Sequence, residues 1–339
     1  MTCAFLSGIF LTICCTLSAA AIDKTYAIRA AIDIGTGGPK LRVAEIDLAT
    51  NKITKLLHTQ NYFVNFYDKK NSGQLSDASM EQGLQAFQEA VDQALSLNAE
   101  GIVAVATASF RSAANGETFA QKIQQETGVQ VHIIDQELEG KLTFQAVLSH
   151  MNSKATKLIV WDIGGGSMQW ISATSDGTYI SAGLKEGVGD FKDFIIEHIQ
   201  HRNPQKTKSP NPMTAEEIEQ AIDHAQDLSC KIDLQLQNKI ASPTTTIVGA
   251  GSVFGRGIQE IIGDKNTFSF EDLAKAVFLL ANHTDADLGG GDFAFVKLSN
   301  ALFVLGFMQH LKIEQMEILD VNNADGAMLY SPFWEGKVR

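Results

Sequence analysis

One succession of elements occurs twice in the sequence. Residues 28–38 and residues 158–167 each consist of a mostly apolar run of strand length, an aspartate and a turn rich in glycine. Two further strands follow each copy, predicted at 40–46 and 52–59, and again at 168–173 and 178–184. Such a repeat is typical of two related domains, and uninterrupted apolar strands indicate a sheet covered on both faces. We therefore predict two α/β domains with a cleft between them.

The two glycine-rich turns have the composition of phosphate-binding loops. Glycine permits a tight turn in which several backbone N–H groups point at one anion. Asp33 and Asp162, at the strand ends, could hold a cation beside those phosphates, since hard cations take oxygen ligands. For a single copy, a glycine-rich β-turn with a turn aspartate would be the better interpretation. Because the whole pattern recurs, it favours a cleft ligand that carries several phosphates.

A third glycine turn lies at 249–252, after a strand predicted at 245–248. The turn opens a predicted helix, and the N-terminus of a helix presents free N–H groups to an anion. Gly251 and Ser252 are therefore candidates for binding an anion or a nucleotide base.

Arg111 follows a short strand predicted at 102–106 and several hydroxyl residues. A guanidinium group pairs with phosphate through two hydrogen bonds, so this segment could form a phosphate-contacting edge. A surface arginine in a loop is an equally good interpretation of the segment by itself.

Glu139 lies between the two halves of the repeat, near the start of a helix predicted from 135 to about 151. Asp135 and Glu137 are explained by the helix dipole, which favours acidic residues in a first turn. A carboxylate at position 139 would face the cleft and could orient or deprotonate a water molecule.

The composition excludes some classes of partner. At 339 residues the chain is long enough for two domains, and its net charge of −12 argues against a general nucleic-acid binder or a protein of anionic membranes. A short polyphosphate held by local loops and a metal ion is compatible with that charge.

The first 21 residues have the features of a secretory signal peptide. Residues 5–17 are mostly apolar but too few to span a bilayer, and 18–21 are small residues suited to cleavage, although no lysine or arginine precedes them. We expect export, with a periplasmic mature chain and no membrane span. Cys230 would be the single cysteine left, so the fold would contain no internal disulfide.

With these segments assembled, the chain resembles the exopolyphosphatase / guanosine pentaphosphate phosphohydrolase family, in the superfamily that includes actin and sugar kinases. The resemblance runs from about Ala30 to Tyr330, and its most specific segments are 103–113, 139–142, 162–167 and 325–327. It implies an α/β, duplicated ribonuclease H-like (actin-like) two-domain fold with an interdomain cleft. We expect the first domain at 22–150, the second at 151–324, and a terminal helix at 325–339 that returns to the first.

The resemblance also implies an activity, the hydrolysis of a terminal phosphoanhydride bond with Mg²⁺ or Mn²⁺. Glu139 would be the base that activates water, and Asp33 and Asp162 would position the cation or the water. The phosphates would be bound by the glycine loops and the arginine, namely Gly35, Thr36, Gly37, Arg111, Gly164, Gly165, Gly166 and Ser167. Short members of the family also suggest a homodimer.

The sequence departs from the family pattern in three places. Gln169 stands where the family has glutamate, so this position keeps an oxygen ligand for a metal and loses a charge. Pro39 follows the first loop and has no N–H to donate. Residues 297–300 replace a proline-glycine signature. We expect no C-terminal helical domain like that of the longer members, and therefore expect short polymers as substrates.

Three functions are compatible with these features. The first is a phosphohydrolase of the exopolyphosphatase type, acting on short polyphosphate or guanosine pentaphosphate. The second is a catalytically weakened sensor that binds such a ligand, which Gln169 and the altered first loop favour. The third is an apyrase-like nucleoside polyphosphatase. A sugar kinase fits least, because an exported protein would lack a steady supply of ATP.

Overall fold

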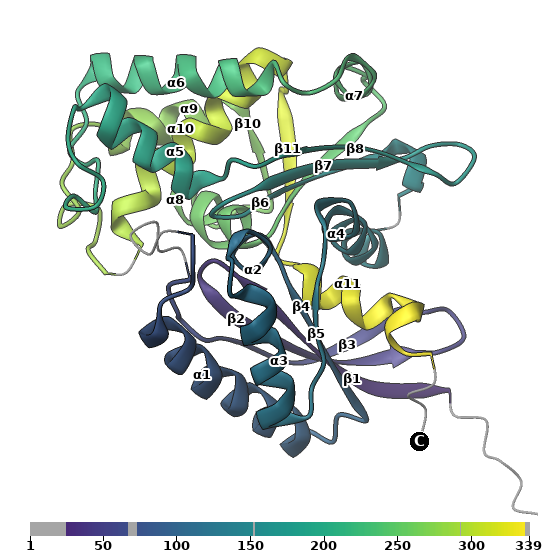
Figure 1. Cartoon of the computed structure of the whole chain (residues 1–339). Coiled ribbons are helices and arrows are strands. Elements are labelled where there is room, and N and C mark those ends of the chain that lie inside the picture. Colours follow the sequence, from purple (N-terminus) through teal and green to yellow (C-terminus); the bar gives the residue numbers. More distant parts are fainter. Residues whose placement is uncertain (1–24, 67–72, 152, 292, 336–339) are drawn as a thin grey trace, which may run out of the picture.

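The computed structural model describes residues 25–66, 73–151, 153–291 and 293–335, and the predicted signal peptide lies outside them. The described chain folds into two α/β domains, each built on one mixed sheet (Figure 1). This architecture confirms the predicted fold class.

The first sheet has the strand order β3-β2-β1-β4-β5. The first three strands form an antiparallel meander, and β4 and β5 continue the sheet in parallel with β1. The strands of this sheet are β1 (Tyr26–Gly35), β2 (Gly38–Asp47), β3 (Lys52–Asn61), β4 (Gly101–Ala106) and β5 (Val131–Ile133).

The second sheet repeats this arrangement in the order β10-β11-β9-β6-β7-β8, with β9 and β11 parallel to the meander strand β6. A short edge strand, β10, is the one addition among the described residues. The strands are β6 (Leu158–Ile163), β7 (Met168–Ala173), β8 (Tyr179–Leu184), β9 (Thr246–Ala250), β10 (Thr267–Ser269) and β11 (Gln315–Leu319). The shared topology agrees with the internal repeat in the sequence.

Helices cover the outer face of each sheet. In the first domain these are α1 (Asp77–Ser96), α2 (Ala108–Ser112) and α3 (Gly116–Thr127). In the second they are α5 (Val188–Phe194), its π-helical continuation Ile195–Ile199, α6 (Ala215–Ser229), α7 (Leu234–Ile240), the π-helical segment Val253–Ile258, α8 (Gln259–Ile261), α9 (Phe270–Leu280) and α10 (Ala294–Leu311). Thr214 and Glu217 cap α6 reciprocally, as their spacing predicts.

The core of the second domain contains stacked aromatic rings. Trp161 of β6 and Trp170 of β7 face each other in register, with ring centroids 4.2 Å apart. Phe303 and Phe307 of α10 pack against Trp161. By length and composition α10 could cross a membrane, but such a helix is weak evidence for a span, and most of α10 is buried in this core.

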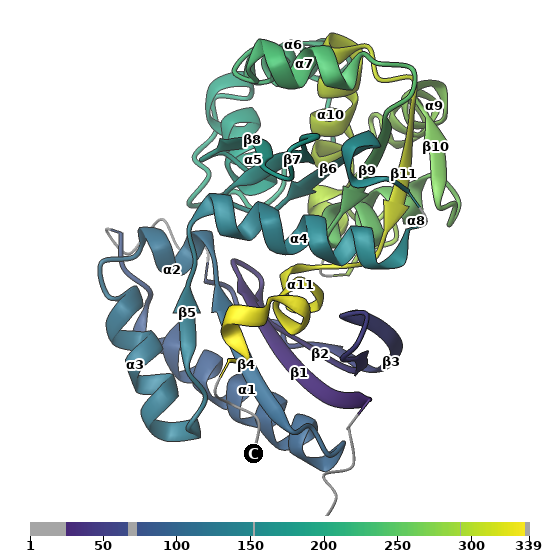
Figure 2. The same ribbon diagram turned by 90° about the vertical axis from the view of Figure 1, so that its right-hand side faces the viewer.

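Two helices lie between the sheets (Figures 1 and 2), α4 (Gln136–His150) and α11 (Asn323–Leu329). Phe144 and Val147 of α4 pack in the cluster that includes the second sheet. Ala327 and Met328 of α11 pack on the first sheet. Each helix therefore follows one domain in the sequence and packs on the other, and the chain crosses between the domains twice.

Candidate active site

A cavity of about 1540 Å³ lies between the two domains. All three glycine turns line it, and so do the carboxylates of Asp33, Glu139 and Asp162. The residues of the turns on its wall are Gly35, Thr36, Gly37, Gly164, Gly165, Gly166, Ser167, Gly251 and Ser252. The structure thus brings together the turns and the carboxylates that the sequence singles out.

The first and second glycine loops touch each other across the cleft. A Cβ atom added to Gly165 would lie 2.3 Å from Oγ1 of Thr36, so only glycine permits this approach. A neighbouring segment supports the second loop, because Val188 and Gly189 donate their N–H groups to the carbonyls of Gly164 and Gly165. The two loops together form one continuous wall.

The third turn packs directly against Asp162. Gly251 has a φ of +82°, and a Cβ atom there would lie 2.6 Å from Oδ1 of Asp162. A side chain at this position would be strained and would displace the carboxylate. Glycine at 251 therefore keeps both the turn and the carboxylate in place.

Glu139 is buried in the first turn of α4, with 5% of its surface exposed. Asp135 caps this helix by accepting from the Leu138 N–H, which agrees with the structural role expected for it. Burial raises the pKa of Glu139 to about 8, against the opposing effect of Arg111. Such a carboxyl is a stronger base than an ordinary glutamate, and it can accept a proton from water once it is ionised, which is mainly above about pH 8.

Arg111 binds within the protein. Its Nη1 atom donates to Oε2 of Glu139 and to the carbonyl of Ile134, both at 2.7 Å. It is not one of the cavity-lining residues. In this structure Arg111 therefore holds the Glu139 carboxylate, and its predicted contact with phosphate stays a prediction.

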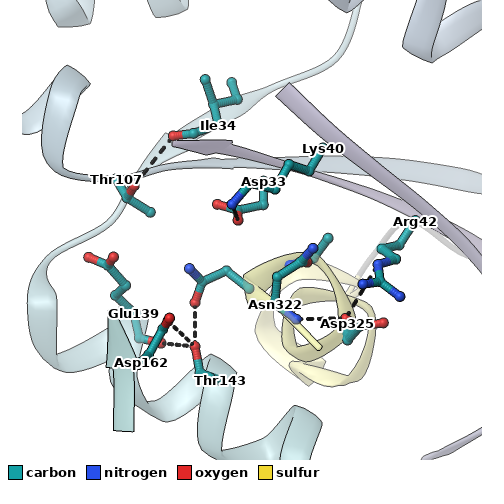
Figure 3. A network of polar contacts seen from close by, with 12 residues as sticks. Asp33, Ile34, Lys40, Arg42, Thr107, Glu139, Thr143, Asp162, Asn322 and Asp325 are labelled. Atoms are coloured by element: carbon teal, nitrogen blue, oxygen red, sulfur yellow. Dashed lines mark hydrogen bonds and ion pairs between the residues drawn. The ribbon is translucent and has the colours of Figure 1, made fainter. Parts of the chain in front are cut away.

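Asp33 and Asp162 lie on the cavity wall from opposite domains (Figure 3). Lys40 Nζ lies 3.4 Å from Oδ2 of Asp33, whereas Oδ1 of Asp33 is buried and has no hydrogen-bond partner among the described residues. Asp162 accepts from the hydroxyl of Thr143 at 2.8 Å, and burial raises its pKa to about 6.

These two aspartates fit a magnesium site that a substrate completes. No group of three or more His, Cys, Asp or Glu side chains able to hold a metal occurs within the described ranges. Magnesium ions often bind through one or two carboxylates, with substrate phosphates and water as the other ligands. The unpartnered Oδ1 atom of Asp33 is an oxygen donor of the kind that such an ion requires.

Gln169 is buried behind the cavity wall that the second glycine loop forms. Its side chain is buried, its Nε2 atom donates to Oγ of Ser167 at 3.2 Å, and its Oε1 atom has no partner among the described residues. It does not line the cavity. The role of Gln169 as a metal ligand stays a prediction.

The sequence interpretation missed several residues in and beneath the cavity. Thr143 is fully buried beneath the wall, where it contacts Asp162 and Asn323. It follows Glu139 by four residues, a helical spacing that places both side chains on one face of α4. Asn323 comes from α11, which no local pattern connects to the site. Basic side chains also line the cavity, and the overall net charge of −12 does not predict them. They are Lys40, Lys192, Arg202, Lys206, Lys208, Arg256 and Lys297.

Comparison with curated proteins gives partial matches. The chain is 27% identical over 161 residues to the bifunctional 3-dehydroquinate synthase/phosphatase of Fusobacterium nucleatum, which covers 45% of this chain and 24% of that protein. It is 29% identical over 119 residues to exopolyphosphatase 1 of Mycobacterium tuberculosis, which covers 35% of each chain. The matched region thus spans a quarter to a third of the length of these relatives.

Solved structures match over nearly the whole fold. A crystal structure of the Aquifex aeolicus Ppx/GppA family member has a TM-score of 0.71 at 19% identity, covering 92% of this chain and 99% of that one. An exopolyphosphatase from Cytophaga hutchinsonii has a TM-score of 0.69 at 15% identity, covering 90% and 98%. At these identities the likeness shows the fold.

The model of the Ppx/GppA phosphatase family matches residues 45–331, which is most of the sequence. The match includes the helix that carries Glu139, the second glycine loop and the α11 segment. It confirms the resemblance that the motifs indicate, and the chain belongs to the Ppx/GppA phosphatase family.

Proposed function

We propose that this protein hydrolyses the terminal phosphoanhydride bond of short polyphosphate or guanosine pentaphosphate. The observation that carries the proposal is the position of Glu139, a buried carboxylate with a raised pKa on the wall that the glycine loops form. The family match and the exopolyphosphatase name of the M. tuberculosis relative support the same substrate class.

The proposed reaction is attack of water on the terminal phosphorus atom. Glu139 accepts a proton from the water, the new P–O bond forms, and the bond to the bridging oxygen breaks, releasing phosphate and a shortened chain. The backbone N–H groups of the loops and Lys40 stabilise the charge on the phosphoryl oxygens. A divalent ion held by Asp33 and Asp162 would add Lewis-acid stabilisation of the same charge.

The rest of the substrate would lie along the basic part of the cavity. Arg202, Lys206 and Lys208 come from one loop of the second domain, and Arg256 and Lys297 from two of its helices. Lys297 pairs with Glu260, which also lines the cavity, at 2.7 Å. The other four cations form a local attraction for a polyanion in a protein of net charge −12.

The test is phosphate release with Mg²⁺ from short polyphosphate, guanosine pentaphosphate and ATP. Wild type should release phosphate. The variant Glu139→Gln keeps the size of the side chain but removes the base, so its kcat should be lower by at least about a hundredfold. Release from ATP alone would select the apyrase-like alternative. Equal rates in wild type and variant would contradict Glu139 as the base.

A weakened sensor is the second candidate, and the position of Gln169 favours it. Gln169 carries no charge and lies behind the cavity wall, so it adds no anionic ligand for a cation. Tight binding of triphosphate without turnover, and a large gain of turnover in Gln169→Glu, would support this function.

We also propose that the protein is exported and works in the periplasm as a mature chain. The support is the apolar stretch at 5–17 and the small residues at 18–21. N-terminal sequencing of protein from the periplasmic fraction should begin near position 22, and a product that retains Met1 in the cytoplasm would contradict export.

A further inference from the structure

Three side chains from different elements meet at the floor of the cavity. Thr143 of α4 is fully buried, and its Oγ1 atom lies 2.8 Å from Oδ2 of Asp162 and 2.9 Å from Oδ1 of Asn323. Asn323 is the first residue of α11, and its side chain lines the cavity. Figure 3 shows Thr143 and Asp162 in this network, with Glu139 and Asp33 close by.

The Thr143 hydroxyl has a single proton, and three oxygen atoms lie within hydrogen-bond distance of it: Oδ2 of Asp162, Oδ1 of Asn323 and, at 3.3 Å, the carbonyl oxygen of Glu139. In the structure Oδ1 of Asn323 faces the Thr143 hydroxyl at 2.9 Å, which leaves the amide nitrogen on the other side. Among the residues that the structure describes, no hydrogen-bond acceptor is found for this nitrogen. Asn323 thus presents two N–H donors from a nearly buried side chain with 5% exposure.

The surroundings indicate what those donors bind. The carboxylates of Asp33, Glu139 and Asp162 line the same cavity, and they would repel a phosphate group. A phosphate that approaches Glu139 therefore needs donors from the floor as well as from the glycine loops. Asn323 is a neutral donor that adds no net charge there.

We propose that Asn323 donates a hydrogen bond to a phosphoryl oxygen of the substrate and that Thr143 is its positioning residue. The inference rests on the proposed function of the same site. It makes α11, which packs on the first sheet, part of the phosphate site, while Thr143 and Asp162 belong to elements that pack in the second domain. Substrate would then link the domains at the floor of the cleft.

The test measures binding without catalysis. The whole chain is titrated with inorganic triphosphate in a calorimeter, with a chelator present so that no divalent ion supports turnover. Asn323→Ala should bind about tenfold more weakly, which is the scale of one hydrogen bond to a charged group. Asn323→Asp should lose more, because it replaces the donors with a fourth carboxylate.

Variants of Thr143 separate positioning from simple stability. Thr143→Val keeps the shape and removes the hydroxyl, so triphosphate affinity should fall several-fold, whereas Thr143→Ser should keep most of it. In steady-state assays with Mg²⁺, Thr143→Val should raise KM more than it lowers kcat. Circular dichroism and thermal unfolding identify any variant that does not fold.

Asn51→Asp is the matched control. The Asn51 side chain donates to the carbonyl of Leu329 at the other end of α11, at 2.8 Å, and lies outside the cavity. Losing this bond loosens α11 without removing a donor from the site, so triphosphate affinity should stay within about twofold of wild type.

Wild-type affinity in folded Asn323→Asp and Thr143→Val would overturn the inference, while phosphate release by the wild type with Mg²⁺ would still support the proposed hydrolase. Weakened binding in these variants, together with no phosphate release from any substrate, would support the role of Asn323 and contradict the hydrolase. A separate titration with Mg²⁺ and no chelator tests a role on the cation. Stronger Mg²⁺ binding in Asn323→Asp, with unchanged triphosphate binding, would show that position 323 acts on the cation through an oxygen ligand, and would also overturn the inference.

Discussion

At the scale of single residues, the protonation of Glu139 determines the pH range of activity. A general base must be deprotonated, and burial raises the pKa of this carboxyl to about 8. The kcat/KM for phosphate release should therefore rise about tenfold per pH unit below 8 and level off above it, since this parameter reports the free enzyme. A rate profile from pH 6 to 9.5 with short polyphosphate and saturating Mg²⁺ measures this. A profile that is flat from pH 6 upward would contradict it.

Arg111 should move that profile. Its guanidinium lies 2.7 Å from the Glu139 carboxylate and lowers the pKa of Glu139 from the value that burial alone would give. Arg111→Met removes the charge and keeps most of the apolar stem, so the pH at which kcat/KM levels off should shift upward. Arg111→Lys, which retains a cation, should shift it less. An unmoved profile in both variants would indicate that another group is the base.

At the scale of elements, the second phosphate loop depends on Gly187. A Cβ atom at this position would lie 2.3 Å from the carbonyl oxygen of Gly164 and 2.6 Å from the nitrogen of Gly166. Gly187→Ala should push the loop out of place and reduce kcat/KM at least about a hundredfold, in line with the loss of oriented N–H donors. Gly183→Ala is the control, because its Cβ would meet only the flexible side chain of Gln136. Similar activity in both variants would contradict this role of Gly187.

The contact between the two crossing helices is another property of elements. A Cβ atom on Gly326 of α11 would lie 2.0 Å from the carbonyl oxygen of Leu142 in α4. Gly326→Ala should therefore lower the free energy of unfolding by about 3 kcal/mol, the upper part of the usual range for overpacking. Urea unfolding followed by circular dichroism measures it. Gly257→Ala, whose Cβ would have only ordinary contacts, should change stability by less than about 1 kcal/mol.

At the scale of the whole molecule, two aromatic rings join the domains at the mouth of the cavity. Phe63 follows β3 in the first domain and Phe293 precedes α10 in the second, and their rings meet edge to face with centroids 5.8 Å apart. Such a pair contributes about 0.5–1.5 kcal/mol, so it favours the closed cleft modestly.

Removing either ring should raise KM for short polyphosphate several-fold and leave kcat nearly unchanged. In a double-mutant cycle, Phe63→Ala and Phe293→Ala should show a coupling of about 1 kcal/mol in kcat/KM. Phe278→Ala is the control, since this exposed ring lies on α9 and does not line the cavity. Strictly additive effects of the two substitutions would indicate that the rings do not hold the domains together.

Much of the fold could be predicted because its signals are local. The strands predicted at 40–46, 168–173 and 178–184 correspond to β2, β7 and β8 within two residues at each end. Strand β10 was missed, since three residues at a sheet edge carry too short a pattern. The predicted turn at 249–252 is also shorter in the structure, because its first two residues belong to β9.

The sequence by itself determined the duplication, the three glycine turns and the carboxylates Asp33, Glu139 and Asp162, because periodicity and turn chemistry act between near neighbours. Only the tertiary structure decided which side chains reach the cavity. It turned Arg111 toward Glu139, left Gln169 behind the wall and brought Asn323 to Thr143, 180 positions away in the chain. Such contacts depend on how α4 and α11 cross between the sheets. The direction of a side chain across an interdomain contact is set by the packing of both elements, and no local pattern records it.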